Sequence, residues 1–275
     1  MTIAGRNRIL IVGICISILL LAVGTVCCVI ITKQGILTDM TVAPQSTFWI
    51  LQQPFFSYTN YAAMIRIASL PLIAVVILIS IFFLFEKTHA LEISFFSLFI
   101  FTLSMEPLQL LFPLQKVYPL LIIFSASIAR TLFFFRFFAC LSLLTASLFA
   151  HKTFTREIGA AIFLLSFISF ALAHTIPINT VRALSFFSFS ELYCSLLYSF
   201  HVIVCALAVF SFLFVGIFRS ISEYRQSALW LLVILIAHVV LLYTGSWAFT
   251  IIGIVALAGG SFLFLRAIHQ FYLWQ

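Results

Sequence analysis

Residues 67–85 read IASLPLIAVVILISIFFLF, an uninterrupted apolar stretch of nineteen residues without a charged side chain. An α-helix needs about 20 predominantly apolar residues to cross the hydrocarbon core of a bilayer. The strands of a membrane β-barrel would instead alternate apolar and polar residues over about ten positions. This stretch therefore predicts a transmembrane helix rather than a barrel strand.

The rest of the chain repeats this pattern. Hydrophobic residues make up 64% of the chain and charged residues only 8%, whereas an ordinary soluble domain carries about 25% charge. We therefore predict an all-α, polytopic bundle that forms a single integral membrane domain, with an external loop over residues 33–66. The eight predicted spans are 9–32, 67–85, 93–112, 119–150, 158–174, 192–218, 228–244 and 247–268.

The Lys and Arg side chains near the span ends are divided unequally between the two sides, and cytoplasmic ends usually carry the excess. An N-terminus in the cytoplasm gives eight basic residues inside and four outside, and the even number of spans then places the C-terminus in the cytoplasm as well. The inner group is Arg6, Arg8, Lys87, Lys152, Arg156, Arg219, Arg225 and Arg266. The outer group is Lys33, Arg66, Lys116 and Arg182, which leaves Arg130 and Arg136 inside the fourth span.

Two spans have alternative interpretations. The first resembles a signal peptide, but it is about 24 residues long and has no clear cleavage site before Lys33, so we expect an uncleaved anchor. Cleavage would leave seven spans and an external N-terminus. The fourth span would measure about 48 Å as one helix, against a core of about 30 Å. Either it is tilted, or residues 113–127 form a separate interfacial or re-entrant piece, which Pro113 and Pro119 favour.

The net charge of +7 does not indicate a nucleic-acid partner. The basic residues are scattered singly between apolar runs, whereas nucleic-acid binding uses a basic patch or stripe. Anionic lipid headgroups are the expected contacts. The six cysteines contain no C-x-x-C pair, so neither a disulfide framework nor a zinc module is indicated, and we interpret them as small buried hydrophobic residues. They are Cys15, Cys27, Cys28, Cys140, Cys194 and Cys205.

A polar stripe follows one face of the predicted sixth span. Its five residues fit within an arc of about 80° at 100° per residue. The stripe lines a water-filled cavity in the outer half of the bundle, or its members make single hydrogen bonds between packed helices with the first residue at the headgroups. The five residues are Glu191, Cys194, Tyr198, His201 and Cys205.

Glu106 and Arg130 lie on consecutive antiparallel spans, at depths that differ by about 7–8 Å when helix rise is counted from the turn between them. A charge inside the membrane needs a partner, so the two are a candidate ion pair. Arg136 faces a different direction and has no obvious partner. Pro107, directly after Glu106, predicts a kink in the third span.

The remaining histidines in the spans are His174, at the end of the fifth span, and His238, on the seventh. In principle His201 and His238 could bind a metal or a haem between two helices, but a metal site needs further ligands and a second shell. We therefore predict neither a metal nor a cofactor.

Small residues recur at helical spacing on one face of the last span, where they permit close helix packing. No phosphate-binding loop, zinc-protease motif or catalytic triad is recognisable, so enzymatic activity is not indicated. The packing residues are Ser246, Gly253, Ala256 and Gly260.

The favoured function is a transporter, or the membrane subunit of a transport complex, with a polar cavity in the outer half of the bundle. The alternatives are a sensor with seven helices after an anchor, or a scaffold subunit that acts through partner proteins; an intramembrane enzyme for lipid substrates is the least favoured. The size and simplicity of the chain fit a prokaryotic inner membrane.

Overall fold

The computed structural model describes residues 3–37, 55–86, 88, 90–150, 158–176 and 191–273, with the side chains of residues 198–272 in the last range. Eight spans in this part of the chain are long and apolar enough to cross a membrane, which confirms the predicted all-α polytopic bundle. Seven are single helices: α1 (Ile3–Lys33), α2 (Asn60–Phe85), α5 (Leu120–Phe149), α6 (Ile158–Thr175), α7 (Glu191–Phe218), α8 (Ser222–Tyr243) and α9 (Trp247–Leu273). The third span combines α3 (Leu91–Leu103), the 3₁₀ helix η2 (Glu106–Leu110) and α4 (Leu111–Leu114).

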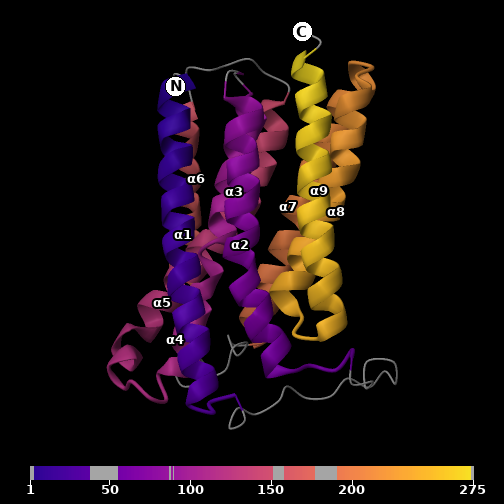
Figure 1. The fold of residues 1–275 in the computed structure, drawn as a ribbon. Helices are drawn as coiled ribbons and strands as arrows, with labels where there is room; N and C mark the ends of the chain where they lie inside the picture. Colours follow the sequence, from indigo (N-terminus) through magenta and orange to yellow (C-terminus); the bar gives the residue numbers. More distant parts are fainter. Residues whose placement is uncertain are drawn as a thin grey trace.

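Successive spans run in opposite directions, and the two ends of the chain lie at the same end of the bundle (Figure 1). Helix α2 packs against α1, α3 and α9, while α5 packs against α3, α6 and α7. Helix α8 lies between α7 and α9. The cytoplasmic placement of both termini stays a prediction from the charge distribution.

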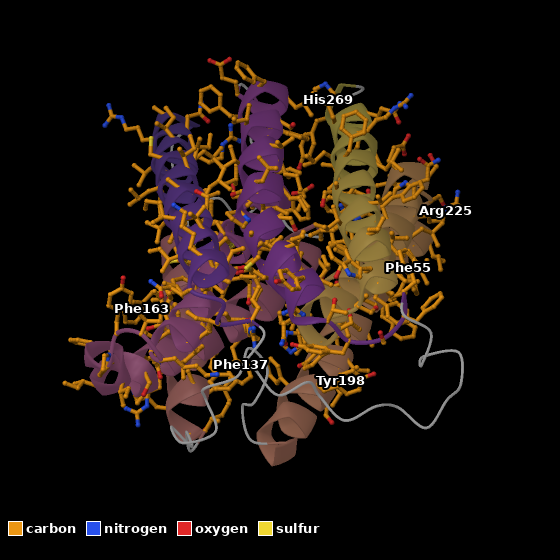
Figure 2. The ribbon with its side chains drawn as sticks, turned by 60° about the horizontal axis from the view of Figure 1, so that its bottom comes forward. Phe55, Phe137, Phe163, Tyr198, Arg225 and His269 are labelled. Carbon is orange, nitrogen blue, oxygen red and sulfur yellow. The ribbon has the colours of Figure 1, made fainter. Side chains whose placement is uncertain are left out.

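The outer surface of the bundle is covered by large apolar side chains. Phe163 on α6 and Phe218 on α7 are 75% and 73% exposed, and Phe163 lies at the rim of the bundle (Figure 2). Apolar surface of this extent would cause association in water, whereas lipid acyl chains solvate it. The protein is therefore a multi-pass integral membrane protein.

A buried carboxylate connects three helices at the end of the bundle that holds both termini. Glu92, near the start of α3, is 2% exposed. It accepts hydrogen bonds from the hydroxyl groups of Tyr224 on α8, at 3.1 Å, and Tyr272 on α9, at 2.9 Å. These two bonds connect α3 to α8 and α9 and satisfy a group that would be costly to bury alone.

At the same end, Arg6 of α1 binds the end of α2. Its guanidinium donates hydrogen bonds to the carbonyl oxygens of Phe85, Glu86 and Thr88. The last carbonyls of a helix have no partners within the helix and carry its negative dipole end, so they favour a cation. Arg6 therefore attaches α1 to α2 as well as contributing to the charge bias.

Helix α2 begins earlier than the sequence predicted. Thr59 caps it by accepting a hydrogen bond from the backbone N–H of Ala62, so the helix runs from Asn60. Arg66 is therefore inside the span rather than at the end of an external loop. Residues 38–54 of that predicted loop lie outside the described residues.

The fourth span is one long helix. Helix α5 is continuous over thirty residues from Leu120, so the favoured separate piece over 113–127 was the wrong alternative. Only the short helix α4 and a turn precede it. The prolines lie before the helix, where they do not interrupt its hydrogen bonds.

Candidate functional site

The third span is interrupted halfway along its length. Pro107 has no N–H group, and its ring would clash with the carbonyl four residues earlier; that residue, Leu103, is the last of α3. The backbone then continues through i to i−3 hydrogen bonds, from Met105 to Thr102 and from Leu108 to Met105, before η2 leads into α4. The first residue of η2 is Glu106, so the break carries a carboxylate.

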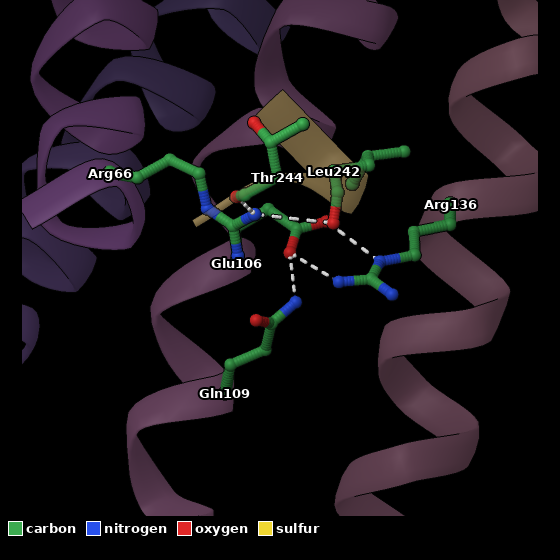
Figure 3. Close-up of polar contacts among 6 residues, drawn as sticks. All are labelled: Arg66, Glu106, Gln109, Arg136, Leu242 and Thr244. Atoms are coloured by element: carbon green, nitrogen blue, oxygen red, sulfur yellow. Dashed lines mark hydrogen bonds and ion pairs between the residues drawn. The ribbon is translucent and has the colours of Figure 1, made fainter. Parts of the chain in front are cut away.

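Glu106 forms a buried, two-pronged ion pair with Arg136 of α5 (Figure 3). Arg136 Nε lies 3.0 Å from Oε1 of Glu106, and Arg136 Nη2 lies 2.8 Å from Oε2. The side chains are only 8% and 6% exposed. Gln109, one turn further along η2, donates a third hydrogen bond to Oε2 at 2.6 Å. The carboxylate at the break is therefore held from two sides.

Arg66 of α2 lies beside this pair, within range of electrostatic interaction with both Glu106 and Arg136. It is 1% exposed and donates hydrogen bonds to the carbonyl oxygens of Leu242 and Thr244 at the end of α8 (Figure 3). A cation at the C-terminal end of a helix is stabilised by the helix dipole. Arg66 thus joins α2 to the turn between α8 and α9, beside the ion pair.

Tyr58, in the extended segment before α2, packs against the same turn between α8 and α9. The backbone of Tyr58 pairs with that of Ser246, and its ring lies so close to Gly245 that a Cβ there would come within 2.2 Å of it. Burial raises the pKa of Tyr58, although the nearby charge of Arg66 acts in the opposite direction. The phenol therefore stays neutral at physiological pH.

A second polar group continues from Arg136 toward α7 and α8. Cys140 lies one turn after Arg136 on α5, His201 is on α7 and His238 is on α8; all three side chains are buried. The rings of His201 and His238 have centroids 5.9 Å apart, and the charge of Arg136 acts on His238. The ion pair and this group therefore lie near each other, and together with Arg66 and Gln109 they are called the polar centre below.

The predicted Glu106–Arg130 pair was wrong. Arg130 is exposed, and the partner of Glu106 is Arg136, six residues further along α5. The estimate of depth counted helix rise from the turn, whereas the observed partner lies six residues, or about 9 Å, further along α5 than Arg130. The axial placement of the two helices therefore differs from that estimate. Six residues also rotate the side chain by about 240°, which explains why Arg130 faces outward.

The described residues of the predicted polar stripe on the sixth span differ in their exposure. The side chains of Glu191 and Cys194 lie outside the described residues. Tyr198, toward the opposite end of the bundle from the termini (Figure 2), is 48% exposed and contacts the ring of Tyr243. Of the other two, His201 is fully buried and Cys205 half-buried. The inner end of the stripe, rather than its whole length, therefore reaches the polar centre.

His174 lies apart from this centre. It is exposed near the end of α6. The centroid of its ring lies 4.0 Å from that of Phe170, and its Nδ1 is 3.0 Å from the Phe170 carbonyl oxygen. These contacts are local to one helix. His174 therefore contributes nothing to the buried centre.

The small residues of α9 lie at its contact with α8. A Cβ on Gly253 would come within 2.7 Å of Leu241 Cγ, and one on Gly260 within 3.1 Å of Ile234 Cγ1. Ser246 is buried at the start of α9, where its hydroxyl accepts from the N–H of Phe249, and Ala256 is half-buried. The two glycines thus permit a close approach of the last two helices.

Sequence reasoning missed three members of the polar centre. Arg66 was counted as a basic residue at a loop end, Cys140 as a small hydrophobic residue, and Gln109 was not considered. Gln109 follows Glu106 at i+3, a spacing that places both on one face of a helix. Cys140 follows Arg136 at i+4, so the spacing in the sequence also places these two residues on one helix face.

Comparison with known proteins finds similarity to a bacterial protein. The chain is 29% identical over 204 residues to a protein of Treponema pallidum (strain Nichols) whose name is "Uncharacterized protein". The match covers 66% of this chain and 59% of that protein, so the chain spans about three fifths of its relative's length. No protein-family model matches the chain, and no solved structure does either.

Proposed function

We propose that this chain is a transporter, or the membrane-embedded subunit of a transport complex, in which the interrupted third span is the moving element. The observation that carries this proposal is the position of Glu106 at the break between α3 and η2. Irregular backbone inside a membrane is tolerated only where protein buries it or where it lines a cavity. In many transporters such interrupted helices hold the substrate or the coupling ion.

The ion pair gives the break a means of changing state. Glu106 is held by Arg136 of α5 and by Gln109 of its own segment. A proton or an ionic substrate that competes for either charge would loosen the contact between η2 and α5. A 3₁₀ segment within a helical span often marks a hinge, so loosening at this point would allow α4 to move relative to α3.

We place the protein in a bacterial inner membrane as part of this proposal. The continuous apolar helices fit a membrane of that type, and the relative in Treponema pallidum is a bacterial protein. Among the described helices only the third span is interrupted. The proposal therefore rests on one broken helix, and not on a pair of broken helices in the two halves of an inverted repeat.

Thiol accessibility beside the break tests the proposal. In a background that lacks Cys15, Cys27, Cys28 and Cys194 but keeps Cys140 and Cys205, Ser104→Cys places a thiol at the end of α3, where the serine is fully buried. A membrane-impermeant thiol reagent is then applied to right-side-out and to inside-out vesicles. Alternating access predicts labelling from both sides, and predicts that Glu106→Gln changes the ratio of the two rates.

The matched control is Ser142→Cys, where the serine is equally buried but lies on α5, six residues beyond Arg136, rather than on the interrupted span. It should be protected from both sides. Labelling of Ser104→Cys from one side only would indicate a receptor-like pocket and contradict transport. Protection from both sides would indicate a rigid, scaffold-like bundle and contradict it equally.

A further inference from the structure

Three buried side chains from three different helices meet in the middle of the bundle. They are Cys140 of α5, His201 of α7 and His238 of α8, and their potential ligand atoms all lie within 4.8 Å of one another. Histidine nitrogen and cysteine sulfur are the ligands preferred by Zn²⁺ and related transition metals, whereas Mg²⁺ and Ca²⁺ prefer oxygen. The cluster therefore has the donor chemistry of a transition-metal site.

A fourth donor lies beside these three. Cys205 follows His201 by one turn of α7, so both side chains project from the same helix face. Its thiol lies close enough to that of Cys140 for the two to interact, and neither forms a disulfide. We propose that Cys140, His201, Cys205 and His238 bind one Zn²⁺ ion, which joins α5, α7 and α8 within the membrane.

Three of the four ligand atoms are already close to the spacing of a tetrahedral site. Zn–S bonds of about 2.3 Å and Zn–N bonds of about 2.0–2.1 Å place ligand atoms about 3.3–3.8 Å apart. The atoms of Cys140, His201 and His238 lie within 4.8 Å of one another, so each would close inward by about an ångström. Cys205 is outside this group, so its thiol would have to approach further from its position beside Cys140.

Burial of the site gives a second reason for a bound ion. His238 is 2% exposed, and its Nε2 makes no hydrogen bond to any residue that the structure describes. Phe99 contacts the edge of this ring, with centroids 5.3 Å apart, and offers no acceptor. A metal bond would satisfy the nitrogen in a place that water reaches poorly.

Charge balance selects a divalent ion. Cysteine binds metals as the thiolate, so two cysteines supply two negative charges. Zn²⁺ with two thiolates and two neutral histidines has no net charge, which minimises the cost of burial in the membrane. Cu⁺ in the same set would leave one negative charge, and is therefore the less favoured ion.

Cys140 is the residue that changes the interpretation of the two histidines. In the sequence, only Glu191 and His174 offered themselves as further ligands for His201 and His238, so no metal site was predicted. The structure places Cys140 against both, and Cys205 beside it. The inference does not depend on transport, because the ion would join the three helices in a scaffold as well.

The test uses the full chain purified in detergent, stripped with a chelator and titrated with Zn²⁺ and with Co²⁺. We expect one equivalent to bind, a thiolate-to-cobalt charge-transfer absorption with Co²⁺, and a higher thermal unfolding temperature with Zn²⁺. Cys140→Ser and His238→Gln should each lower the affinity at least about tenfold. Cys28→Ser, which alters a half-buried thiol on α1, should leave it unchanged.

The wild-type titration decides the outcome even if the variants fold poorly. A monodisperse wild-type protein that shows neither the cobalt spectrum nor stabilisation by Zn²⁺ would overturn the site. Equal affinities for Cys140→Ser and Cys28→Ser would do so as well. Binding of Cu⁺ without binding of Zn²⁺ would overturn the assignment of a divalent ion.

Discussion

Arg136→Leu removes the arginine that is hydrogen-bonded to Glu106. The Arg136 guanidinium is buried and makes two bonds to Glu106, so the substitution leaves a buried carboxylate without its bonded counter-charge inside the membrane. Breaking a buried pair in this way costs about 3–5 kcal/mol. We expect the free energy of unfolding in detergent micelles to fall by that amount.

Two variants control for this effect. Arg130→Leu removes an exposed guanidinium of the same helix and should change the stability by less than about 0.5 kcal/mol. Glu106→Gln combined with Arg136→Leu removes both charges and keeps an acceptor for Gln109, so it should recover most of the loss. If Arg130→Leu and Arg136→Leu were equally damaging, the assignment of the pair would be wrong.

Helices α8 and α9 pack closely against each other at the glycines of α9. Gly253→Ala would place a methyl group 2.7 Å from Leu241 Cγ, which forces the two helices or the leucine to shift. Overpacking of this kind costs about 1–3 kcal/mol. We expect the thermal unfolding temperature to fall accordingly.

Gly259 on the same helix provides the matched comparison, because nothing lies within 4 Å of a Cβ at that position. Gly259→Ala should be neutral or stabilise the protein by up to about 1 kcal/mol, the difference in helix propensity. A loss of stability in Gly259→Ala similar to that in Gly253→Ala would show that helix packing is not the cause.

The orientation of the whole molecule follows from the distribution of basic residues and the even number of spans. Both ends of the chain lie at one end of the bundle (Figure 1), and the charge bias predicts that this end is cytoplasmic. A green fluorescent protein fused after Gln275 should therefore fluoresce. An alkaline phosphatase fused after Lys116, in the turn between α4 and α5, should be active; the reverse pattern would show inverted insertion.

The eight spans were predictable because the free energy of transfer into lipid is a sum over neighbouring residues of one stretch. The start of α2 was missed because the cap at Thr59, which starts the helix before Arg66, is a single polar residue that a hydropathy average does not register. The break in the third span was predicted, because Pro107 lacks an N–H group and ends α3 at Leu103.

The candidate site was only partly predictable. Glu106, Arg136, His201 and His238 stand out in the sequence because polar groups in a membrane are costly. Their partners do not, because a cysteine such as Cys140 resembles any other small buried residue until a histidine is placed against it.

The sequence by itself determined that the protein is a multi-pass helical bundle, since burial in lipid depends on composition along the chain. Only the tertiary structure decided that Glu106 binds Arg136 rather than Arg130, and that Cys140 meets His201 and His238. The physical reason is that such pairs depend on the axial shift and rotation of helices relative to one another. Those quantities arise from the packing of the whole bundle, and a displacement of about 9 Å, six residues of helix rise, is enough to exchange one partner for another.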